Sequence, residues 1–163
     1  MLEIEKPDIE IESLSEDGKN GRFVVEPLES GYGITIGNSL RRVLLSSLPG
    51  AAVSFVNIRG VEHEFATIPG VLEDVPEIIL NIKEIILKSH IDEPVHLTIE
   101  KSGEGELLAG DIQTGIDVEI VNPGHHIASL NEDANVYMDL TVERGRGYEP
   151  SELKKDQVSQ IGV

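Results

Sequence analysis

The residues best suited to metal or acid–base chemistry are two adjacent histidines, His125 and His126, with carboxylates at Asp111, Asp117 and Glu119. Such a set could hold a divalent metal and activate water, as in a metal-dependent hydrolase. Adjacent residues of a strand point to opposite faces of a sheet, so one metal ion could not readily bind both histidines. The sequence has no third histidine at a useful spacing, no phosphate-binding loop, no nucleophile motif and no cysteine. We therefore predict a non-catalytic chain without a metal or cofactor.

A compact basic run, Arg144-Gly145-Arg146-Gly147-Tyr148, could by its composition bind phosphate or RNA. The chain as a whole has 30 Asp and Glu against 13 Lys and Arg, which gives a net charge of -17. A charge of this sign disfavours contact with a nucleic-acid backbone. We therefore expect a turn whose arginines neutralise nearby carboxylates or contact a partner protein, and no direct binding of DNA.

The first predicted helix begins at Asn38 or Ser39, runs to Ser47 and stops at Pro49-Gly50. At about 100° per residue, its apolar side chains cover an arc of roughly 200°, which is wider than one sheet can cover. The residues of this arc are Ile36, Leu40, Val43, Leu44, Leu45 and Leu48.

Two arrangements would satisfy so wide an apolar arc. The helix could lie in the middle of its own lobe, or part of the arc could contact another chain. Arg42 and Ser46 occupy the narrow polar side, whereas Arg41 falls inside the apolar arc. An arginine among leucines favours an interface, because planar guanidinium groups suit partly desolvated protein contacts.

The second predicted helix starts with strong local signals. Asp74 and Glu77 have the spacing of a capping box, and Pro76 stands in the first turn, where no amide donor is needed. Its apolar residues fall within roughly 120°, with Leu80 outside, which is typical of a helix packed on a sheet. These apolar residues are Val75, Ile78, Ile79, Ile82, Ile85 and Ile86.

The remaining chain is rich in short Val, Ile and Thr segments separated by 16 glycines and 8 prolines, which favours strands. Apolar residues near 9–14 and 23–25 form two short runs, and a polar coil follows Tyr148. Further strands are predicted at 51–58, 85–88, 95–100, 106–111, 118–121, 126–130 and 135–142. The fold class is therefore α+β. With no apolar run near the ~20 residues of a membrane helix and an acidic start unlike a signal peptide, a cytoplasmic location is expected.

An ordered series of motifs covers nearly the whole chain. It consists of FVVEPLE at 23–29, GYG at 31–33, GNSLRRVLLSSLPGAAV at 37–53, GVEHEF at 60–65, GDI at 110–112, DVEI at 117–120 and RGRGY at 144–148. The series resembles the bacterial RNA polymerase alpha subunit family. The resemblance implies a two-lobed amino-terminal domain of α+β class, with a β-rich lobe inserted into a dimerisation lobe.

On this resemblance, residues 1–51 form part of the dimerisation lobe, residues 52–155 the insert lobe, and residues 156–163 the return to the first lobe. Family members continue into further strands, a second dimerisation helix, a linker and a DNA-binding domain. The chain is therefore expected to be a truncated amino-terminal domain. Part of the apolar arc of its first helix would then lack its usual cover.

The resemblance also implies a function, that of the non-catalytic scaffold on which RNA polymerase, a nucleotidyltransferase, assembles. The implied partners are a second alpha subunit, the beta subunit and the beta-prime subunit, with transcription regulators as further candidates. The implied beta contacts are Arg41, Arg42, Ser46, Glu62, His63 and Glu64. The implied beta-prime contacts are Asn81, Lys83 and Glu84. The alternative is a stand-alone interaction module that docks a transcription regulator.

Overall fold

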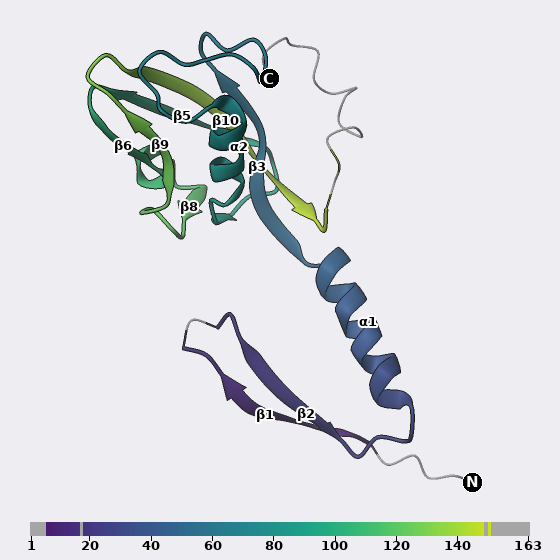
Figure 1. Cartoon of the computed structure of the whole chain (residues 1–163). Helices are drawn as coiled ribbons and strands as arrows, with labels where there is room; N and C mark the ends of the chain where they lie inside the picture. The colour runs from purple at the N-terminus through teal and green to yellow at the C-terminus, as the bar shows by residue number, and fades with distance from the viewer. Residues whose placement is uncertain (1–5, 17, 149, 151–163) are drawn as a thin grey trace. The chain divides into compact units, whose positions relative to one another are not determined.

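The computed structural model describes residues 6–16, 18–148 and 150. The chain divides into two compact units, residues 1–46 and 47–163, and each is described by itself (Figure 1). The structure is mostly β-strand with two α-helices, which confirms the predicted α+β class. None of the helices in these described ranges combines the length and apolar character needed to cross a membrane.

The first unit contains one β-hairpin and one helix. Strands β1 (Asp8–Leu14) and β2 (Gly21–Glu26) pair antiparallel, with Ile9 opposite Val25 and Ile11 opposite Phe23. Because paired residues of an antiparallel ladder share a face, these four apolar side chains lie on one side of the hairpin.

Helix α1 (Tyr32–Ser46) begins six residues before the predicted cap, so the prediction of a start at Asn38 or Ser39 was wrong. The turn before it contains Gly31 at φ 90°, and the helix then continues through Gly33 and Gly37. Glycine inside a helix costs only about 1 kcal/mol relative to alanine, which is too little to exclude helical structure. Ser39 is consequently an interior residue whose hydroxyl donates to the carbonyl oxygen of Thr35 at 2.8 Å.

The main element of the second unit is a six-stranded sheet in the order β7-β5-β10-β3-β4-β8, with antiparallel pairing throughout. Its strands are β3 (Pro49–Ile58), β4 (Leu87–Ser89), β5 (Val95–Ser102), β7 (Ile112–Gln113), β8 (Val118–Ile120) and β10 (Asn135–Arg146). A second, two-stranded sheet pairs β6 (Gly105–Leu108) with β9 (His126–Leu130).

Several predicted boundaries need correction in this unit. The predicted strand 106–111 ends at Leu108, because residues Ala109–Asp111 form a 3-10 turn, η1. Strand β10 continues four residues beyond Val142 to Arg146, because it stays paired with the first residues of β3. The predicted coil after Tyr148 falls largely outside the described residues, and the predicted lobe boundaries at 51 and 155 remain predictions.

Helix α2 (Val75–Lys83) begins as the sequence predicts. The carboxylate of Asp74 accepts a hydrogen bond from the amide of Glu77 at 3.0 Å, and Pro76 stands in the first turn. The helix ends at Lys83, so Ile85 and Ile86 follow it instead of continuing its apolar face. Leu80 is exposed, as predicted.

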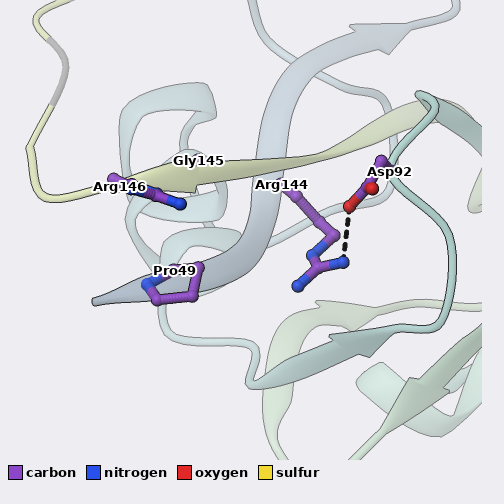
Figure 2. Close-up of a pocket in the computed structure, with 5 residues that line it drawn as sticks. All are labelled: Pro49, Asp92, Arg144, Gly145 and Arg146. Atoms are coloured by element: carbon purple, nitrogen blue, oxygen red, sulfur yellow. Dashed lines mark hydrogen bonds and ion pairs between the residues drawn. The ribbon is translucent and has the colours of Figure 1, made fainter. Parts of the chain in front are cut away.

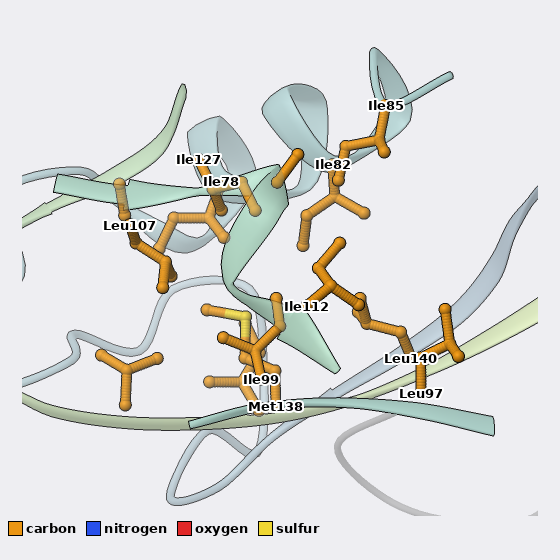
Figure 3. Packing of buried hydrophobic residues seen from close by; sticks show 14 of the residues in the cluster. Ile78, Ile82, Ile85, Leu97, Ile99, Leu107, Ile112, Ile127, Met138 and Leu140 are labelled. Carbon is orange, nitrogen blue, oxygen red and sulfur yellow. The ribbon is translucent and has the colours of Figure 1, made fainter. Parts of the chain in front are cut away.

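One continuous hydrophobic core joins α2 to both sheets. Figure 3 shows Ile78, Ile82 and Ile85 on one side of the cluster and Ile99 and Met138, from the central strands β5 and β10, on the other. The largest fully buried side chains are Ile78, Ile99, Leu107, Ile127, Met138, Leu140, Val136 and Val142. The second unit therefore has a closed core of its own.

Candidate functional site

Helix α1 presents its apolar residues to solvent. No residue of this helix is buried, and Leu44 and Leu45 are 60% and 68% exposed. Leu40 and Val43 are also exposed, whereas Ile36 is half-buried. Burial of a leucine side chain is worth about 1.5–3 kcal/mol, so covering this face with another apolar surface would be favourable.

Helix α1 also carries residues predicted to contact the beta subunit, with Arg42 and Ser46 on its polar side and Arg41 inside the apolar arc. Arg41, Arg42 and Ser46 are all exposed. Arg42 and Ser46 are four residues apart and so lie on the same face of the helix, where the Ser46 hydroxyl donates to the Arg42 carbonyl at 2.6 Å. Leu48, which the sequence analysis placed on the apolar arc, is exposed in the segment after the helix ends.

The apolar face of the β1–β2 hairpin is a second exposed surface in the same unit. Ile9, Ile11 and Phe23 are 72%, 61% and 56% exposed. The opposite face is charged and includes an ion pair between Arg22 Nε and Glu12 Oε2 at 2.8 Å. No role was predicted for this face, although the alternation of Ile9 and Ile11 with acidic residues is a sequence signal for it.

The loop before α2 carries the second set of predicted contacts. Glu62, His63 and Glu64 are exposed, and Phe65 is 82% exposed. The rings of His63 and Phe65 lie 6.4 Å apart at 44°, and the amide of Ala66 donates to the carbonyl of His63 at 3.0 Å. The loop thus presents an aromatic ring and two carboxylates together at the surface.

A half-buried carboxylate, that of Glu73, attaches this loop to strand β9. The Glu73 side chain is only 9% exposed, and its Oε2 accepts a hydrogen bond from the Ser129 amide at 2.6 Å. Its Oε1 lies 2.9 Å from the Ser129 hydroxyl and 3.0 Å from His126 Nε2. We call this cluster of Glu73, His126 and Ser129 the loop latch.

The loop latch also sets the charge state of Glu73. Burial would raise the pKa of this carboxyl, but the hydrogen bonds from the Ser129 amide and the His126 ring outweigh burial and hold the pKa below its ordinary value of 4.5.

The same loop has a main-chain contact at Gly70, whose carbonyl accepts a hydrogen bond from the amide of Asn131 at 2.9 Å. Gly70 has φ 81°, and a Cβ there would lie 2.6 Å from Asn131 Oδ1, so only glycine fits.

The predicted residues at the end of α2 differ in accessibility. Lys83 and Glu84 are exposed. Asn81 is half-buried, donates through Nδ2 to the Ile127 carbonyl at 2.9 Å, and its own carbonyl lies 2.9 Å from His125 Nε2. Asn81 therefore holds α2 against β9, and Lys83 and Glu84 are the members of this set that a partner can reach.

The candidate hydrolase residues are engaged in separate structural contacts. His125 bonds to Asn81 and His126 to Glu73, while Lys88 Nζ lies 3.6 Å from Glu119 Oε1. Within the described ranges, no group of three or more His, Asp or Glu side chains converges on a metal-sized site.

Asp111, another of the candidate hydrolase residues, has a structural role in the turn after β6. Its Oδ2 lies 2.7 Å from Lys101 Nζ and accepts a hydrogen bond from the Leu108 amide at 2.8 Å. Burial would raise the pKa of Asp111, but these two contacts outweigh it and lower the pKa below its ordinary value. The carboxylate therefore stabilises the η1 turn.

Both arginines of the basic run lie in a strand that ends at Arg146, so the prediction that they lie in a turn was wrong. Arg144 and Arg146 belong to β10, where they pair with Ala51 and Pro49 of β3. Arg144 Nη1 lies 2.5 Å from Asp92 Oδ1, so this arginine does neutralise a nearby carboxylate. Asp92 was not predicted as the partner, because 52 residues separate it from Arg144.

Comparison with known proteins gives one consistent result. Residues 56–163 match the family model described as the RNA polymerase Rpb3/RpoA insert domain. The full chain is 60% identical to the DNA-directed RNA polymerase subunit alpha of Moorella thermoacetica and 57% identical to that of Desulfitobacterium hafniense, covering 51% and 52% of those proteins. The same subunit of Desulforudis audaxviator is 60% identical over all 163 residues, with 52% of its length covered. The chain thus spans about half the length of these relatives.

Proposed function

The chain belongs to the RNA polymerase Rpb3/RpoA insert-domain family, and we propose that it is part of the non-catalytic alpha-subunit scaffold of a bacterial RNA polymerase. The observation that carries the proposal is the identity of 57–60% over all 163 residues to proteins named as that subunit. No observation favours the alternative of a stand-alone module for a transcription regulator. The proposal assigns the nucleotidyl-transfer reaction to the assembled polymerase and places that enzyme in the cytoplasm.

We propose that the apolar side of α1 contacts a second alpha subunit. The helix has no buried residue, and Leu40, Val43, Leu44 and Leu45 are each more than half exposed. A face of this kind gains free energy when a second apolar face covers it. Pairing with another copy of the same helix surface would give the closed two-fold contact that is the commonest form of homodimer.

The proposed beta-subunit contact uses the polar side of α1. Arg42 is exposed, and the Ser46 hydroxyl donates to its main-chain carbonyl, so this hydrogen bond leaves the guanidinium group able to reach a partner carboxylate. Arginine suits such a contact because its planar group forms two parallel hydrogen bonds with a carboxylate. Arg41 of the same helix is proposed to extend this contact, and the exposed loop residues Glu62, His63 and Glu64 of the second unit are proposed to contact the beta subunit separately.

The proposed beta-prime contact is at the end of α2. Lys83 and Glu84 are exposed there, and Asn81 supports them by fixing the helix to β9. This placement is compatible with a contact made by the second unit alone, because all three residues belong to that unit.

Capture of purified beta subunit by the immobilised chain tests the scaffold role. The variant Arg42→Ala should keep the far-UV circular dichroism spectrum of the wild type but weaken capture by about tenfold or more, as expected for an arginine at the centre of an interface. The matched control is Arg22→Ala, which removes another exposed arginine, one paired with Glu12 on the hairpin. Capture that Arg42→Ala leaves unchanged would remove Arg42 from the contact, and no capture by the wild type would contradict the proposed docking.

A further inference from the structure

A shallow groove of about 250 Å³ lies where β3 begins and β10 ends. It is lined by Pro49, Asp92, Arg144, Gly145 and Arg146, all within the second unit (Figure 2). None of these residues belongs to the contacts proposed above. We call this feature the arginine groove.

Strand geometry places both guanidinium groups on one face of the sheet. Arg144 and Arg146 are two residues apart in β10, so their side chains point to the same side, about 7 Å apart along the strand. Their register partners in β3 are Ala51 and Pro49, which are small and uncharged. The floor beside the two arginines therefore carries no carboxylate from the neighbouring strand.

The groove also borders an open strand edge. Strand β5 pairs with β10 only as far as Val95 opposite Val142. In the described part of the chain, no strand pairs with Arg144, Gly145 or Arg146 on that side. An extended peptide can add to such an edge through main-chain hydrogen bonds, while its alternate side chains contact one face of the sheet.

The two arginines differ in how their charge is balanced. Arg144 pairs with Asp92, whose side chain is 89% exposed, and an ion pair this exposed is weak and easily exchanged. Arg146 is exposed and has no carboxylate partner among the residues that the structure describes. The groove thus offers one cation directly and a second by exchange of a surface carboxylate.

We propose that the arginine groove docks an extended acidic segment of a partner protein. Carboxylates on alternate residues of an extended segment repeat about every 7 Å, which matches the spacing of Arg144 and Arg146. A small-molecule site is disfavoured because the groove is open and smaller than the ~300 Å³ typical of such pockets.

Nucleic acid is the less favoured occupant. A duplex carries about one charge per 1.7 Å, so the net charge of -17 repels it along its whole length. A short segment with two or three carboxylates meets much less of that repulsion, because salt screens charges beyond ~8 Å. The proposal does not depend on the scaffold role, since it uses only the geometry of the second unit.

The test is a fluorescence anisotropy titration of the full chain with a labelled octapeptide of alternating Glu and Thr. The same peptide with Gln in place of Glu and an oligonucleotide of eight thymidines serve as comparison probes. We expect the Glu peptide to bind best, and Arg146→Ala and Arg146→Gln each to weaken it by about fivefold, the upper range for an exposed ion pair. The double variant Arg144→Ala, Arg146→Ala should bind the Glu peptide more weakly than either single variant of Arg146.

Lys88→Ala is the matched control, because Lys88 is an exposed cation of the same sheet that pairs with Glu119 and does not line the groove. It should leave the affinity for the Glu peptide within about twofold of the wild type. The proposal is overturned if the Glu peptide does not bind, if the Gln peptide binds equally well, or if Lys88→Ala weakens binding as much as Arg146→Ala. Tighter binding of the oligonucleotide would overturn it in favour of a nucleic-acid site.

Discussion

Replacement of Glu73 by alanine should destabilise the second unit far more than an ordinary surface substitution. The carboxylate is 9% exposed and has three contacts, with the Ser129 amide, the Ser129 hydroxyl and His126 Nε2. Glu73→Ala removes all three and leaves the half-buried Ser129 amide without its acceptor. The loop between β3 and α2 then loses its side-chain attachment to β9.

The expected cost follows from these contacts. Hydrogen bonds to a charged group contribute about 1.5–3 kcal/mol each, but neighbouring bonds are not additive and burial of the carboxylate offsets part of the gain. We therefore expect Glu73→Ala to lower the free energy of unfolding by about 2–4 kcal/mol, or roughly 10 °C in thermal midpoint for a unit of this size. Glu73→Gln keeps the shape and one acceptor oxygen, so about 1 kcal/mol is expected.

The stability that Glu73 contributes should decrease at acidic pH. Because the pKa of Glu73 is lower in the folded chain than its ordinary value of 4.5, the unfolded chain takes up the proton first as the pH falls. The stability that Glu73 contributes is therefore fully present above about pH 5 and is lost as the pH falls through the folded pKa. The difference in thermal midpoint between the wild type and Glu73→Gln should shrink as the pH falls below about 4.5.

Thermal unfolding followed by circular dichroism measures both effects, with Glu119→Ala as the control. Glu119 is an exposed glutamate whose one ion pair with a described residue is the 3.6 Å contact with Lys88, so its loss should cost about 0.5 kcal/mol or less. Equal midpoints for Glu73→Ala and Glu119→Ala at pH 7 would refute the loop latch. A difference in thermal midpoint between the wild type and Glu73→Gln that persists unchanged to pH 3 would refute the lowered pKa of Glu73.

Two further predictions concern the two helices. In a denaturant titration, Ile78→Ala should lower the free energy of unfolding by about 2–5 kcal/mol, because Ile78 is 0% exposed. Leu80 is 61% exposed, so Leu80→Ala should lower it by less than about 1 kcal/mol. Similar losses for the two variants would contradict the packing of α2. In hydrogen exchange on a dilute monomer, amides of residues 39–48 should exchange faster than those of 75–86, because α1 has no buried residue and α2 contributes Val75, Ile78 and Ile82 to the core. Equal protection without intermolecular contact would contradict the exposed state of α1.

The sequence predicts α2 well and α1 poorly, for a physical reason. The start of α2 depends on local chemistry, since Asp74, Pro76 and Glu77 are neighbours in the chain. The start of α1 contains Gly33 and Gly37, whose low helix propensity indicates a loop unless the rest of the segment favours a helix. Local signals of this kind identify elements, but they place boundaries less well.

Contacts between distant segments were not predictable from periodicity. Glu73 and Ser129 are 56 residues apart, and nothing in either segment indicates the partner. The end of β10 was missed for the same reason, because Gly145 and Gly147 indicate a turn, whereas pairing with Pro49 and Gly50 of β3 extends the strand. The apolar arc and the polar side of α1 were predictable because both are local patterns, whereas the partner contacts assigned to them remain predictions.

The most direct test of the scaffold role is photo-crosslinking from the polar side of α1. A photoreactive amino acid is introduced at Ser46, on the face that carries Arg42, and at Glu119 of β8 as a control, and each chain is mixed with purified beta subunit. We predict an efficient crosslink to the beta subunit from position 46 and little or none from position 119. A stable complex that shows no crosslink from position 46, or equal crosslinking from both positions, would contradict the account.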